Sequence, residues 1–199
     1  MTMLKPKVQS FTPKFPVDRI KDTVLSGMQA FFGKLNSRFH WDSDEKETGV
    51  MIVDKYALNL ESVDRVPIIA TSRGPITKLS RTLDDIKSIN MSTGDKQRMD
   101  LLQCPLNIGC YSKEGLDSER LASIVFGLFL MFREQFRRND LWDVINPVLG
   151  EEQIVKADSE IEYSITPVTM TVLISESWIT QPLAALLENI LDPFDKSVR

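Results

Sequence analysis

The stretch LQCPLNIGC, residues 102–110, decides the fold of this 199-residue chain. Every even-numbered position in it is apolar, whereas the odd-numbered positions hold Gln, Pro, Asn and Gly. An alternation with a period of two is typical of a β-strand that buries one face. We therefore predict a strand whose buried side carries Leu102, Cys104, Leu106, Ile108 and Cys110.

The two cysteines of the chain, Cys104 and Cys110, both lie in this stretch. Residues six positions apart on a strand are separated by roughly 20 Å, since each residue advances the chain by about 3.3 Å. A disulfide requires Cα atoms within about 7 Å of each other. The predicted strand therefore excludes a disulfide, and we expect both cysteines to be small core side chains.

The next apolar stretch, LASIVFGLFLMF at residues 121–132, predicts a helix. Asp117 or Ser118 can serve as its N-cap, and it should end near Arg138. Its centre is apolar almost all round, so we expect protein on more than one side of it. Its apolar run of about 12 residues is too short to span a bilayer, which takes roughly 20. The helix should pack on the buried side of the strand.

Upstream of the predicted strand and helix, residues 1–16 contain three prolines and predict an extended tail. Phe11 and Phe15 could anchor the tail on a neighbouring surface, and a disordered tail is an equal alternative. The tail has no apolar run of signal-peptide length, so we expect a soluble protein that is made in the cytoplasm. Apolar residues then recur at steps of three and four, which predicts an amphipathic helix from about Val17 to Phe39.

The remaining elements are predicted to be strands and turns, apart from one last short helix. Pro67 favours the start of a strand or a sheet edge. A turn at residues 92–95 favours a hairpin between its flanking strands. Two closing strands alternate apolar and polar residues on either side of Pro167. Strands are expected at residues 50–53, 66–71, 86–91, 97–111, 161–165 and 168–174.

The last predicted helix begins at Pro182 and ends before Pro193. It carries an apolar stripe, which either its own sheet or a neighbouring copy could cover. We divide the chain into an extended N-terminal tail (1–16), a single domain (17–181) and a C-terminal helix or arm (182–199). The predicted fold class is α+β, in which a long N-terminal helix and a central apolar helix pack on a largely antiparallel sheet.

The composition excludes several kinds of site. Lys and Arg total 24 against 28 Asp and Glu, a formal net charge of −4, whereas nucleic-acid-binding domains usually carry a basic surplus. One His and two Cys cannot supply a site built from several imidazole or thiolate ligands. A phosphate-binding loop has four residues between its glycines, whereas Gly27 and Gly33 enclose five. We therefore predict no metal, cofactor or nucleotide site.

Three groups of polar residues remain as candidates for chemistry. His40, beside Trp41 at the predicted end of the first helix, suits capping or packing better than base catalysis. Glu160 and Glu162 share one strand face about 7 Å apart, a spacing found both in carboxylate catalysis and on any solvent-facing strand. The third group consists of Arg133, Arg137 and Arg138, which follow the apolar run. These residues could bind phosphate or complement the dipole of the apolar helix.

From Val66 to Trp178 the order of elements resembles that of the tail terminator (neck) proteins of long-tailed bacteriophages. An N-terminal helix precedes the strand led by VPII at 66–69, and a hairpin leads into the strand at 102–111. The helix that begins GLDSERLA at 115–122 follows, and a strand pair ending SESW at 175–178 closes the pattern. The likeness covers somewhat over half of the chain and contains no catalytic signature. The two terminal segments are not part of it, which leaves room for a related neck or tail-completion role.

This resemblance implies a non-enzymatic subunit, without cofactors, of a six-fold ring that caps the tail tube and joins it to the head connector. The expected partners are copies of itself, the tail tube protein and connector or neck proteins, with the tail sheath as a further candidate. Genomic DNA would pass through the lumen without sequence-specific binding, and no membrane is involved. The expected location is the virion, after assembly in the host cytoplasm.

Three competing classes stay open. They are another tail-completion protein, a monomeric adaptor that binds one partner peptide, and a small carboxylate-dependent hydrolase. For the ring, we expect the apolar residues of the two terminal segments to form the subunit contacts, because ring subunits often exchange such segments. These residues are Phe11, Phe15, Leu183, Leu186, Leu187, Ile190, Leu191 and Phe194.

Overall fold

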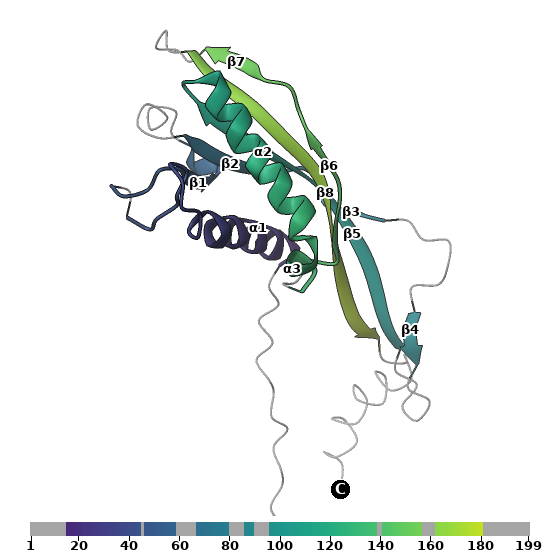
Figure 1. Ribbon diagram of the computed structural model, residues 1–199. Coiled ribbons are helices and arrows are strands. Elements are labelled where there is room, and N and C mark those ends of the chain that lie inside the picture. Colours follow the sequence, from purple (N-terminus) through teal and green to yellow (C-terminus); the bar gives the residue numbers. More distant parts are fainter. Residues whose placement is uncertain are drawn as a thin grey trace, which may run out of the picture.

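The computed structural model describes residues 15–44, 46–58, 67–79, 86–89, 96–138, 141–156 and 162–180. Within these ranges the chain forms helices on one side of a long, twisted sheet (Figure 1). The helices are α1 (Pro16–Phe32), α2 (Gly115–Met131), α3 (Arg133–Arg138) and the short 3-10 helix η1 (Lys55–Ala57). The strands are β1 (Met51–Asp54), β2 (Ile68–Arg73), β3 (Thr77–Lys78), β4 (Ile86–Ile89), β5 (Lys96–Ser112), β6 (Asp143–Leu149), β7 (Gln153–Lys156) and β8 (Glu162–Thr180).

All of these strands belong to one sheet, in the order β1-β2-β5-β8-β6. Strands β3 and β4 also pair with β5, and β7 pairs with β8. Only the β1–β2 pair is parallel among the described strands, and the other pairs are antiparallel. The predicted α+β class with a largely antiparallel sheet is therefore confirmed.

The centre of the sheet is a long two-stranded ribbon made of β5 and β8. The two strands pair without interruption from Lys96 opposite Thr180 to Ser112 opposite Ser164. Figure 1 shows the lower end of this ribbon, with β4, extending beyond the helices. The sequence predicted two strands separated at Pro167, which is wrong, because β8 runs straight through that residue.

Each of the two central strands contains a proline, although proline lacks the N–H that a strand ladder requires. The N–H and C=O of one residue point to the same side of an antiparallel strand. The Pro167 carbonyl accepts a 2.8 Å hydrogen bond from Gly150, and the Pro105 carbonyl accepts one of 2.7 Å from Gly74. Gly150 lies between β6 and β7, and Gly74 lies between β2 and β3. Both prolines therefore face a gap where the outer neighbour changes from one strand to the next.

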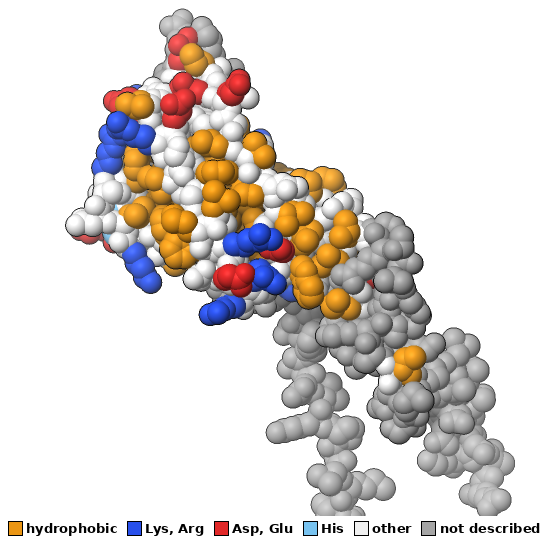
Figure 2. Space-filling view, turned by 45° about the vertical axis from the view of Figure 1, so that its right-hand side comes forward, with side chains coloured by type: hydrophobic (Ala, Val, Ile, Leu, Met, Phe, Trp, Pro, Cys, Tyr) orange, Lys and Arg blue, Asp and Glu red, His pale blue; other side chains and the backbone are white. Residues whose placement is uncertain are grey.

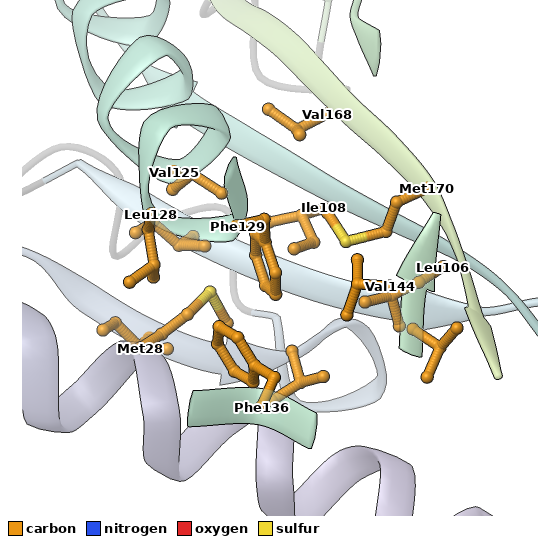
Figure 3. Packing of buried hydrophobic residues seen from close by; sticks show 14 of the residues in the cluster. Met28, Leu106, Ile108, Val125, Leu128, Phe129, Phe136, Val144, Val168 and Met170 are labelled. Atoms are coloured by element: carbon orange, nitrogen blue, oxygen red, sulfur yellow. The ribbon is translucent and has the colours of Figure 1, made fainter. Parts of the chain in front are cut away.

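The main core lies between the helices and the sheet. Figure 3 shows Phe129 of α2 and Phe136 of α3 pointing into this space, toward side chains of β5 and β8. Cys104, Leu106, Ile108 and Cys110 are all buried on the predicted face of β5, and Leu102 packs against the same cluster. A smaller cluster consists of Ile68, Ala70, Tyr111 and Tyr163.

The central helix differs from its prediction in two respects. It begins at Gly115 with Glu114 as N-cap, rather than being capped by Asp117 or Ser118. Both of those side chains are buried in the first turn, where partners from elsewhere in the chain engage them. The helix is interrupted at Phe132 and continues as α3. The sheet and α3 both contact α2, while Leu130 is 53% exposed.

The first helix is shorter than predicted. It ends at Phe32 with Gly33 as C-cap, and the chain then turns back so that the Trp41 N–H donates to the Phe32 carbonyl at 3.2 Å. Leu35 and Phe39 continue the apolar spacing because they also pack on the core, although they lie outside the helix. The helix begins at Pro16, within one residue of the predicted start.

Strands β6 and β7 were not among the predicted strands, and Asn146, Pro147 and Gly150, which lie within or between them, are residue types that favour turns. Asn146 has a φ of 51°, and the pairing of β6 with β8 shifts between Ile145 and Val148. A bulge and a proline are common on edge strands, where they discourage pairing with other chains. These turn-favouring residues thus mark an irregular edge strand rather than a loop.

Candidate interaction surface

The structure places one of the predicted contact residues. Phe15 is the N-cap residue of α1 and is 67% exposed. The other predicted contacts lie outside the described residues: Phe11, Leu183, Leu186, Leu187, Ile190, Leu191 and Phe194. Residues 1–14 of the predicted tail and the predicted C-terminal helix lie outside them as well.

The single imidazole, His40, is not at a helix end as predicted, since α1 ends eight residues earlier. It lies in the loop after α1, where its Nδ1 is 3.1 Å from the Leu35 carbonyl oxygen. Its Nε2 is 3.9 Å from an Asp42 carboxylate oxygen. These contacts hold together the turn between Leu35 and Asp42.

Replacing His40 with Gln should therefore change stability only modestly. A glutamine can still donate to the Leu35 carbonyl, and a single hydrogen bond contributes about 0.5–1.5 kcal/mol. Thermal unfolding and gel filtration of the variant would check this. Loss of assembly in a variant with an unchanged melting temperature would instead assign His40 a functional role.

The two cysteines are free and buried. Burial raises the pKa of both the Cys104 and the Cys110 thiol, because a thiolate loses its hydration inside the core. Reactive cysteines need the thiolate form and some exposure. Both are therefore core side chains, as the strand pattern predicted.

The candidate ionic groups mostly join elements of the fold. The Arg133 guanidinium contacts both oxygens of Asp143, at 2.6 and 2.5 Å, which ties α3 to β6 and lowers the pKa of that carboxyl. Arg137 donates to Glu134 at 2.9 Å and to the Trp142 carbonyl at 3.2 Å. These contacts favour a structural role over phosphate binding. Arg138 lies at the end of α3 and is exposed.

The carboxylate pair cannot be assembled from the described residues. Glu162 begins β8, is exposed and is paired in register with Lys156. Glu160 lies outside the described residues.

A buried hydroxyl cluster joins the start of α2 to β8. The Ser118 hydroxyl is 3.0 Å from that of Ser164 and 2.9 Å from that of Thr166. Ser164 also donates to the Glu152 carboxylate. A nucleophilic serine needs an adjacent base, commonly an imidazole, and the bonded partners of this cluster are hydroxyls, a carboxylate and a backbone carbonyl. The cluster therefore anchors the helix, and sequence reasoning, which treated Ser118 as a cap, missed it.

The described part of the chain also lacks two further features. No three His, Cys, Asp or Glu side chains gather there in a way that could hold a metal ion. No helix in that part is long and apolar enough to cross a membrane.

A groove of about 1260 Å³ lies between α1 and the α2–α3 junction. Gly27 allows the two sides to approach, because a Cβ at that position would lie 2.6 Å from the Phe136 ring. Phe31 and Phe132 meet edge-to-face across the groove with ring centroids 5.6 Å apart. Its apolar lining includes Leu25, Phe31, Leu35, Leu128, Phe132 and Phe136.

The groove is too large for an ordinary small-molecule site, since such pockets measure about 300–1,000 Å³. Lys34 and Arg138 contribute positive charge to its lining, and Asp22 contributes one negative charge. An apolar floor between two helices with charged margins is the form of site that accepts an amphipathic helix.

No family model matches this chain, and no curated protein matches it. The surface itself therefore supplies the functional evidence.

A second surface feature follows the sheet edge at β6. Seven large apolar side chains lie exposed along β6, β7 and the end of α2: Leu130, Met131, Trp142, Val148, Leu149, Ile154 and Val155. Helix α2 packs beside β6, so these elements adjoin. Figure 2 shows hydrophobic side chains spread over much of one face, next to a group of acidic and basic ones. Exposed apolar areas of this extent mark sites of protein contact.

Proposed function

We propose that this protein is a structural subunit of the neck of a long-tailed bacteriophage. In this role it forms a ring that caps the tail tube and joins it to the head connector. The order of elements on which the resemblance rests supports the proposal, although β8 is one strand where the pattern has two. The ring would act without catalysis and would belong to the virion.

The observation that carries the proposal is the apolar edge formed by β6, β7 and the end of α2. Val148 and Ile154 are 54% and 69% exposed, which is unfavourable for side chains of this size unless a partner covers them. The edge differs chemically from the opposite edge strand β1, which carries Asp54 and faces α1. A surface without a self-complementary counterpart suits head-to-tail contacts, which form a ring when the rotation between successive copies closes.

A monomeric adaptor is the second candidate, and the groove beside α1 favours it. An adaptor of this kind would bind one partner helix there and would need no contact between its own copies. The two candidates differ in the state of the purified protein.

The test is the mass of the purified protein over a range of concentrations, measured by gel filtration with light scattering. A ring subunit should give a species near six times the chain mass of 22.7 kDa, and electron microscopy should show closed rings. An adaptor should remain at the chain mass at every concentration. A monomer at millimolar concentration would therefore contradict the ring.

A further inference from the structure

We propose that residues 182–194 of one copy, which include the predicted helix that ends before Pro193, bind in the α1–α3 groove of a neighbouring copy. This inference rests on the proposed ring and names one of its subunit contacts. The occupant is thus a second copy of this chain, through its C-terminal segment.

The dimensions of segment and groove agree. Along α1 the groove is lined from Asp22 to Phe31, which corresponds to about 14 Å at 1.5 Å per residue. The apolar stripe of the predicted helix runs from Leu183 to Leu191, which corresponds to about 12 Å, and Phe194 follows it. The stripe therefore fills the groove lengthwise.

The two surfaces also agree in chemistry. The stripe and Phe194 present leucines, an isoleucine and a phenylalanine to a lining of leucines and phenylalanines. Glu188 and Asp192 are four positions apart, so they share one flank of the predicted helix. Lys34 and Arg138 supply the opposite charge at the groove. This pairing favours one orientation of the bound helix, in which the acidic flank avoids Asp22.

The path of β8 shows why the groove belongs to another copy. Arg19 of α1 contacts the Glu176 carboxylate at 2.6 Å. Beyond this contact the strand continues to Thr180, by about 13 Å at 3.3 Å per residue. Figure 1 shows this end of the ribbon leading away from α1 and α3.

The link between β8 and the predicted C-terminal helix is short. Gln181 alone separates the end of β8 from Pro182, where the predicted helix begins. A helix of residues 182–192 would be about 15 Å long at 1.5 Å per residue. Even if it turned back along the ribbon, it would extend little beyond Glu176 and would not run along the groove from Asp22 to Phe31 of its own copy. We therefore place it in the groove of a neighbouring copy.

Cysteine cross-linking between two co-expressed variants tests this contact directly. One variant carries Ala30→Cys in the groove, where Ala30 is exposed, and the other carries Ile190→Cys and a longer affinity tag. The native thiols at 104 and 110 are 0% exposed and give little background. Mild oxidation should produce a cross-linked pair of unequal chains, whose size identifies it on a denaturing gel.

Ser43→Cys in place of Ala30→Cys is the matched control, because Ser43 is equally exposed but lies outside the groove lining. The groove variant should cross-link several-fold more than this control. Equal or absent cross-linking overturns the docking. A third variant carries both substitutions in one chain. If only this variant cross-links, and only within its own chain, the docking is also overturned, since the helix then binds its own groove.

Charge reversal provides a second measurement that needs no cross-link. Lys34→Glu with Arg138→Glu should weaken association several-fold, and adding Glu188→Lys with Asp192→Lys should restore it. Failure to restore association contradicts the proposed orientation. If the protein forms rings without the cross-link, the docking fails and the ring proposal stands, whereas a monomeric protein contradicts both.

Discussion

Replacing Phe129 with Ala should lower the free energy of unfolding by about 3–5 kcal/mol. Phe129 is 1% exposed and stacks on Phe136 with ring centroids 4.8 Å apart. It lies where α2, α3 and the sheet meet (Figure 3), so its removal leaves a cavity that all three elements line. In a chain of this size each kcal/mol corresponds to about 2–4 °C, so the melting temperature should fall by about 6–20 °C.

Leu130→Ala is the matched control on the same helix. Leu130 is the next residue but is 53% exposed, and surface substitutions usually change stability by no more than about 0.5 kcal/mol. Chemical denaturation of both variants measures the difference. Equal effects of the two substitutions would show that the packing under α2 is not the main source of stability.

Deleting residues 182–199 should convert the ring into folded monomers. Each leucine or phenylalanine that becomes buried contributes about 1.5–3 kcal/mol, so losing the stripe and Phe194 should weaken association by several orders of magnitude. Light scattering should then give the mass of one truncated chain. Circular dichroism should retain the spectrum of the full-length protein, since β8 is complete at Thr180.

The other outcomes of this deletion are equally informative. An unfolded chain would place the segment in the core of its own subunit. An intact multimer would exclude the segment from the ring contact and leave the β6–β7 edge as the interface. Leu130→Ala is a suitable full-length control for assembly only if that edge proves not to be involved.

The residues that face the core could be predicted wherever one periodicity was unbroken. The alternation from Leu102 to Cys110 identified the buried side of β5, because a strand with helices on one side must place apolar residues at every second position. The spacing from Ile20 to Met28 identified the buried side of α1 for the corresponding reason. The apolar pattern overran the end of α1 because Leu35 and Phe39 pack on the core from turns.

Irregular elements could not be predicted from local pattern. Asn146 and Pro147 are typical of turns, and only the pairing of β6 with β8 shows that they belong to a strand. In the sequence, Pro167 suggests a break between two strands. The structure accommodates this proline within β8 because its neighbour there is Gly150, which lies 17 positions earlier in the chain. The β-propensity of a residue contains no information about which residue lies opposite it on the neighbouring strand.

The surface was the least predictable part. The groove depends on the approach of Phe136 to Gly27, two residues more than 100 positions apart, and neither one indicates a hollow by itself. Asp117 and Ser118 were interpreted as caps because such residues favour helix starts. Their roles depend instead on Arg38 and Ser164, which only the tertiary structure brings close.

The position of β8 has a consequence for how the chain is made. This strand forms the middle of the sheet, yet it is the last strand to leave the ribosome. Ser112 cannot pair until Ser164, 52 positions later, has been synthesised, and Lys96 cannot pair until Thr180, 84 positions later, has been synthesised. Pairing of such distant residues is slow, and the apolar sides of β5 and α2 stay uncovered meanwhile. We therefore expect the nascent protein to depend on chaperones until its synthesis is nearly complete.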